Sequence, residues 1–141
     1  MKTTDLILSA VLLLSAAVGC YILVTDTYLW SVAPTHAYGL VAFTFIDLAS
    51  IVVLRTRPRA AIILATLLGL IQLGAMSGDI FFGTMTFSPS VTTAAAFSKY
   101  LLGNAAFVTL LGMQAVLIIV GIAAYLTWHR TVAAAKEIAG A

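Results

Sequence analysis

The chain alternates between four long apolar stretches and three shorter, more polar segments. A helix needs about 20 predominantly apolar residues to cross a hydrocarbon core of about 30 Å. The stretches that meet this length are residues 5–24, 37–54, 60–82 and 100–128. The pattern therefore predicts an all-α membrane protein, in which four transmembrane helices form a compact bundle and the whole chain is a single domain.

Each break between the stretches contains residues that end helices. Residues 25–35 include Pro34, residues 55–59 read Arg-Thr-Arg-Pro-Arg, and residues 83–98 combine Pro89 with several Ser and Thr. Composition agrees with this division, because 62% of the residues are hydrophobic and only 9% are charged. Soluble domains carry about 25% charged residues.

The basic residues are distributed unevenly between the two ends of the predicted bundle. In a four-span topology six of the seven lie at one end and Lys99 lies at the other. Lys and Arg near membrane ends are retained in the cytoplasm, so we expect a multi-pass cell-membrane protein with cytoplasmic N- and C-termini. The six residues are Lys2, Arg55, Arg57, Arg59, Arg130 and Lys136.

The net charge of +2 is therefore a topology signal rather than a sign of nucleic-acid binding. Arg55, Arg57 and Arg59 are candidates for binding anionic lipid headgroups, although anchoring of the topology is the simpler interpretation.

The start of the chain loosely resembles a lipoprotein signal that ends at Cys20. Asp5 lies where such signals prefer positive charge, so we expect this segment to remain as the first span. Cys20 is the single cysteine, which excludes an intramolecular disulfide, and we expect it to pack as a small apolar residue.

Small residues recur at helical spacing within the apolar stretches. In lipid, helices associate through close backbone approach at such residues, and we expect these to pack helices within the bundle. They are Ser15 and Gly19, Ala65 and Gly69, Gly74 and Gly78, and the further glycines Gly112 and Gly121.

The second stretch carries a polar stripe around an acidic residue. At about 100° per residue, Thr44, Asp47 and Ser50 share one face, and His36 falls within about 20° of it. Arg55 lies about 12 Å further along the axis, too far to neutralise the carboxyl group. We therefore expect Asp47 to face the bundle or a partner and to be protonated or to exchange protons.

Two interpretations of Asp47 remain open. In one it binds a proton or small cation during transport, as intramembrane carboxylates often do. In the other, which we favour, it is a hydrogen-bonding group that fixes helix register or contacts a neighbouring subunit. Gln72 and Gln114 lie at similar depth in the third and fourth spans and could bond to each other across helices.

Four polar residues are expected near the other end of the bundle, which raises the possibility of a metal or proton-entry site. Asp26, His36, Asp79 and Asn104 match no metal motif, and the only other histidine, His129, lies at the opposite face. We predict no metal and no cofactor.

Aromatic residues gather in and beside the segment between the third and fourth spans: Phe81, Phe82, Phe87, Phe97 and Tyr100. We expect this segment either to lie in the headgroup region or, slightly favoured, to contact a neighbouring protein.

The sequence contains no nucleophile motif and no phosphate-binding loop, so we expect a protein that is not an enzyme on its own. Our leading hypothesis is an accessory or structural subunit of a larger membrane complex, bound to other membrane subunits or to copies of itself. The alternative is a small homo-oligomeric transporter or channel in which Asp47 titrates.

Overall fold

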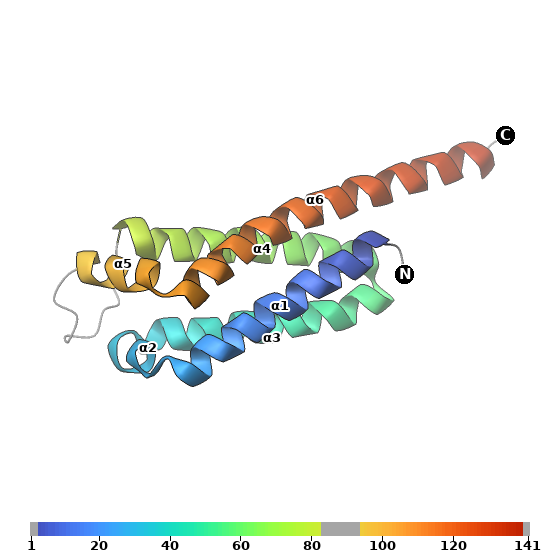
Figure 1. The fold of residues 1–141 in the computed structure, drawn as a ribbon. Coiled ribbons are helices and arrows are strands. Elements are labelled where there is room, and N and C mark those ends of the chain that lie inside the picture. Colours follow the sequence, from blue (N-terminus) through green and yellow to red (C-terminus); the bar gives the residue numbers. More distant parts are fainter. Residues whose placement is uncertain (1–2, 83–93, 140–141) are drawn as a thin grey trace.

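A computed structural model, which describes residues 3–82 and 94–139, is helical throughout that part of the chain (Figure 1). Four helices are long and apolar enough to cross a membrane, which confirms the predicted class of multi-pass helical membrane protein. The helices are α1 (Thr3–Thr25), α2 (Thr27–Val32), α3 (Pro34–Thr56), α4 (Pro58–Phe82), α5 (Ala94–Gly103) and α6 (Ala105–Ala139).

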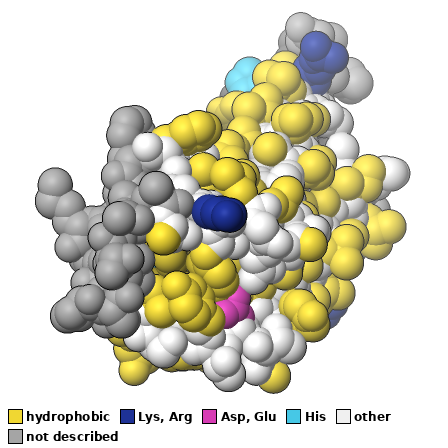
Figure 2. Space-filling model, turned by 60° about the vertical axis from the view of Figure 1, so that its left-hand side comes forward, with side chains coloured by type: hydrophobic (Ala, Val, Ile, Leu, Met, Phe, Trp, Pro, Cys, Tyr) yellow, Lys and Arg dark blue, Asp and Glu magenta, His cyan; other side chains and the backbone are white. Residues whose placement is uncertain are grey.

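The four long helices form two layers, α1 with α3 and α4 with α6 (Figure 1). Helix α1 packs against α3 and α6, and α4 packs against the same two helices, so that α3 and α6 lie across the bundle from each other. The layers meet through buried apolar side chains such as Leu8, Leu12 and Leu117. Much of the surface in Figure 2 is hydrophobic, as expected of helices that face lipid.

The turn between α3 and α4 is as short as a helical hairpin allows. Helix α3 ends at Thr56, only Arg57 intervenes, and Pro58 begins α4. Proline lacks a backbone N–H and clashes with a preceding helical turn, so it ends one helix but suits the first position of the next. The two helices are therefore held closest at this end.

At the opposite end, α2 closes the connection between α1 and α3. The Asp26 side chain accepts a hydrogen bond of 2.9 Å from the Leu29 amide and so caps the N-terminus of α2. The Trp30 indole donates to the Leu23 carbonyl at 2.8 Å. These bonds satisfy polar groups that the turn would otherwise leave unpaired.

The fourth apolar stretch differs from the sequence-based bounds. It begins at Ala105 rather than at Tyr100, because Asn104 breaks the helix: its side-chain oxygen accepts from the Ala106 amide at 3.0 Å. Tyr100 belongs instead to the separate helix α5. Helix α6 continues past the apolar stretch to Ala139, a length of about 52 Å at 1.5 Å per residue.

The N-terminus, the C-terminus and the turn at Arg57 lie at one end of the bundle, whereas α2 and α5 lie at the other (Figure 1). We call these the basic end and the distal end. At the basic end the Arg59 guanidinium lies over the Trp128 ring, 5.0 Å from its centroid, which links α4 to α6 through a cation–π contact.

The small residues divide into two groups. A Cβ atom on Gly19 would meet Thr44, one on Gly69 would meet the backbone of Gln114, and one on Gly121 would overlap Thr66. These glycines let helices approach closely inside the bundle, as predicted. In contrast, a Cβ atom on Gly74, Gly78 or Gly112 would meet nothing within 4 Å, so these three do not serve packing among the described residues.

We expect Gly121→Ala to lower the free energy of unfolding by about 1–3 kcal/mol, because the added methyl group would force α4 and α6 apart. Thermal unfolding in detergent, followed by circular dichroism, measures this. Gly112→Ala is the matched control and should be neutral or slightly stabilising, since alanine favours helix. Equal effects of the two changes would contradict close packing at Gly121, and Thr66→Ala should partly rescue Gly121→Ala.

Candidate functional site

A layer of polar side chains crosses the centre of the bundle, and each long helix contributes to it. Its members are at most 1% exposed. Gln114 on α6 donates to the Ser15 hydroxyl on α1 at 2.9 Å, and the Asp47 carboxyl group faces Ser15 and Gln72. The central polar layer consists of Ser15, Asp47, Ser50, Gln72 and Gln114.

Four atoms of this layer have no hydrogen-bond partner among the described residues: Asp47 Oδ1, Ser50 Oγ, Gln72 Nε2 and Gln114 Oε1. Two of them are acceptors and two belong to groups that donate. Buried polar atoms are paired in most structures, so the layer retains unused hydrogen-bonding capacity on three helices.

The polar stripe of α3 is buried, as expected of a face directed into the bundle. Thr44 donates to the Leu40 carbonyl at 2.8 Å and packs against Gly19. Ser50 is fully buried. Gln114 pairs with Ser15 rather than with Gln72. The similar depths of Gln72 and Gln114 did not indicate this pair, because Ser15 was predicted only to be a small packing residue.

His36 lies apart from Asp47, at the distal end. Its Nε2 atom is 3.2 Å from Asp79 Oδ1 on α4, and its ring packs against the Phe97 ring with centroids 5.5 Å apart. The side chains of His36 and Asp79 are 18% and 15% exposed. The pair therefore joins α3 to α4 where these helices are farthest from their tight turn.

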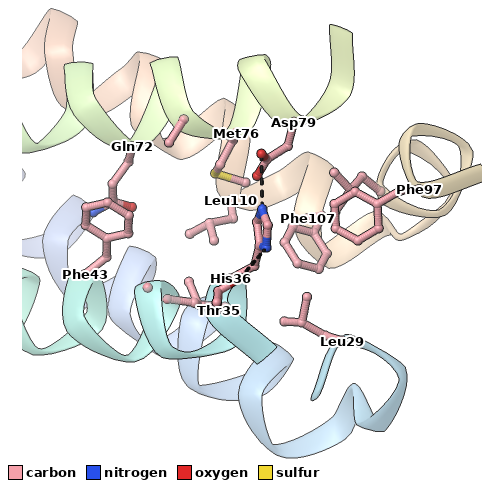
Figure 3. A pocket seen from close by; sticks show the side chains of 14 residues that line it. Leu29, Thr35, His36, Phe43, Gln72, Met76, Asp79, Phe97, Phe107 and Leu110 are labelled. Atoms are coloured by element: carbon pink, nitrogen blue, oxygen red, sulfur yellow. Dashed lines mark hydrogen bonds and ion pairs between the residues drawn. The ribbon is translucent and has the colours of Figure 1, made fainter. Parts of the chain in front are cut away.

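A cavity of about 290 Å³ lies between α3 and α4, and the His36–Asp79 pair lies near the middle of its lining (Figure 3). Gln72 and Phe43 lie on one side of the pair, and Phe107 and Phe97 lie on the other. The walls are mostly apolar, and include Phe43, Met76, Phe97, Phe107 and Leu110. Asp47, Thr44 and Ser50 do not line the cavity.

A second polar cluster at the distal end is centred on Asp26. One carboxylate oxygen caps α2, and the other accepts from the Tyr100 hydroxyl and, at 2.9 Å, from the Asn104 amide. We call these three residues the distal lock, because they join the α1–α3 layer to α5 and α6. Burial, followed by the neighbouring Asp26 carboxylate, raises the pKa of the Tyr100 phenol well above its usual value.

The four polar residues expected to converge at this end thus form two separate sites. Asp26 joins Asn104, and His36 joins Asp79. Across the described residues, no three His, Cys, Asp or Glu side chains are close enough to hold a metal ion. Tyr100, which also donates to Asp26, was predicted only as part of the aromatic segment, and its sequence position gave no separate signal.

The aromatic segment does not behave as one surface. Phe97, expected near a headgroup or a partner, is fully buried in the distal core with Ile22, Leu29 and Leu110, because α5 folds back over the open end of the bundle. Phe81 is 77% exposed. Phe87 and the Phe82 side chain lie outside the described part of the structure.

Comparisons with protein-family models, with curated proteins and with solved structures gave no significant match. The functional argument therefore rests on the contacts within this chain.

The raised pKa of Tyr100 predicts a loss of stability at high pH. The unfolded phenol ionises near pH 10, whereas the folded one keeps its proton, so the unfolded state binds fewer protons there and stability falls as pH rises. The thermal midpoint should drop more between about pH 9 and about pH 11 in the wild type than in Tyr100→Phe. Parallel pH profiles would show that Tyr100 is not held protonated by the fold.

Proposed function

We propose that this protein is a noncatalytic subunit of a larger membrane complex, which it joins through the lipid-facing side of α4. The observation that carries this proposal is the open pair Gly74 and Gly78. Glycines four residues apart on one helix let a second transmembrane helix approach closely. Here no helix among the described residues fills that place.

Larger exposed side chains lie near the open glycines. Leu70 and Ile71, one turn before Gly74, are 49% and 60% exposed. A helix face of this kind, with bulky residues beside glycines, offers a shallow groove to the ridge of another helix. The inward glycines Gly69 and Gly121 show that this chain uses a close glycine contact where α4 packs against α6.

The environment of Asp47 supports a structural role over transport. Its carboxyl group is 1% exposed and is separated from the cavity, which ends at Gln72. A transport site needs a path for water or ions to the titrating group. We therefore interpret Asp47 as a polar contact that fixes the relative positions of α1, α3 and α4.

The proposal includes an orientation. Arg55, Arg57, Arg59 and Arg130 belong to segments at the basic end, and the positive-inside rule assigns that end to the cytoplasm of a cell membrane. The distal end, with the lock and the His36–Asp79 pair, then faces outward. The three arginines around the tight turn are suited to contact anionic headgroups.

Mild extraction from the native membrane, followed by blue-native electrophoresis and mass spectrometry, tests the proposal. We expect the wild type to migrate with a defined set of other membrane subunits and Gly74→Leu/Gly78→Leu to be released from them, because two bulky side chains would block close helix approach.

Gly112→Leu is the matched control, since it adds the same side chain at another open glycine, and it should stay in the complex. A wild-type protein that migrates alone would refute the proposal. A complex made only of its own copies would favour a homo-oligomer and call for proton-flux assays on Asp47→Asn.

A further inference from the structure

We propose that the cavity between α3 and α4 binds a small aromatic compound of naphthalene size that carries a hydroxyl group at one end and an acceptor oxygen at the other. The inference rests on the size of the cavity, its aromatic walls and the positions of its polar groups. It is independent of the proposed subunit role.

The volume of the cavity suits two fused rings. A dry protein cavity of about 150 Å³ lined by apolar side chains binds benzene, and this one has about 290 Å³. Three phenylalanines, Phe43, Phe97 and Phe107, contribute to its lining. Aromatic rings favour edge-to-face and offset contacts with another ring, so these walls prefer a flat aromatic guest to an alkyl chain.

The His36–Asp79 pair presents acceptor atoms to the cavity. His36 Nε2 lies 3.2 Å from Asp79 Oδ1, and in the neutral tautomer that donates to this carboxylate, Nδ1 is left as an acceptor. Nδ1 lies 3.4 Å from the Thr35 hydroxyl, which also lines the cavity. The Thr35 hydroxyl can donate to Nδ1, so a ligand hydroxyl is left to donate to the Asp79 carboxylate. The same carboxylate disfavours a phosphate headgroup, because like charges repel.

The end of the cavity near Gln72 offers a donor. Gln72 is 1% exposed, and its Nε2 atom has no partner among the described residues. The terminal torsion of glutamine is broad and roughly two-fold, so a half turn exchanges the positions of its oxygen and nitrogen. The Asp47 carboxyl group faces this amide and, when protonated, can donate to the amide oxygen, which leaves the nitrogen to donate to an oxygen inside the cavity.

The spacing of these groups sets the ligand length. Gln72 and Asp79 are seven residues apart on α4, or about 10 Å along its axis. Two hydrogen bonds of about 2.8 Å leave a gap of about 5 Å. An aromatic ring with oxygens at opposite corners spans such a gap, whereas a ring with a single oxygen can reach only one of the two polar ends.

Binding of three related probes to the full-length protein in lipid nanodiscs tests the inference. The probes are 4-methoxy-1-naphthol, which carries both oxygens, 1-naphthol, which lacks the acceptor ether, and 1-methoxynaphthalene, which lacks the hydroxyl. Their fluorescence is titrated against protein, with empty nanodiscs subtracted. We expect saturable binding of the first and about tenfold weaker binding of each of the others, since each lost hydrogen bond leaves a buried group unpaired.

Two variants locate the site. Gly39→Leu should abolish binding, because Gly39 lines the cavity and a side chain there has open space to fill. Gly112→Leu, an equal change at an open glycine outside the cavity, should leave binding intact. Gln72→Leu should lower the affinity of 4-methoxy-1-naphthol to that of 1-naphthol and leave 1-naphthol unchanged.

Equal binding of the three probes would overturn the inference, because it would show partition into an apolar gap without recognition of either oxygen. Unchanged binding in Gly39→Leu would also overturn it. If Gly39→Leu does not fold, as judged by circular dichroism and gel filtration, binding of the three probes to Gln72→Leu decides alone. Recognition then requires weaker binding of both methoxy-bearing probes and unchanged binding of 1-naphthol.

Discussion

Lipid cannot hydrogen-bond a polar side chain, and the arrangement of this bundle depends on that constraint. The surface is apolar, so burial of apolar area does little to choose which helix faces meet. Which helix faces meet is determined instead by the few polar side chains of the central layer and by the glycines that admit close backbone contact. Ser15, Asp47 and Gln114 point inward because no other direction offers them a partner, and each of their helices is thereby fixed in rotation.

Much of the fold could be predicted from sequence because its signals are local. Apolar length defines the four spans, and Pro58 marks the tight turn in the chain itself. The break at Asn104 was missed because residues 100–103 are as compatible with a continuous helix as the residues that follow, and only the side-chain cap at Ala106 shows the interruption. Similarly, an amphipathic count placed His36 on the face of Asp47, but it could not show that Asp79 would bind it.

The candidate sites were harder to predict because they depend on which helices are neighbours. Gln72 and Gln114 have matching depth, yet Gln114 binds Ser15 since α6 packs on α1 as well as on α4. The cavity has no sequence signature at all. It results from helices that are pinned together at Arg57 and diverge toward their other ends, where α5 only partly fills the space with Phe97.

The tight turn at Arg57 holds α3 and α4 together at the basic end, and the distal lock restrains the two layers at the distal end. A small change in the angle between α3 and α4 at the turn produces a larger displacement of their distal ends, because each helix is about 30 Å long or more. The hydrogen bonds from Tyr100 and Asn104 to Asp26 hold the two layers at one separation. The width of the opening is thus set jointly by the His36–Asp79 pair, which lines it, and by three side chains that do not, so residues outside the cavity also control access to it.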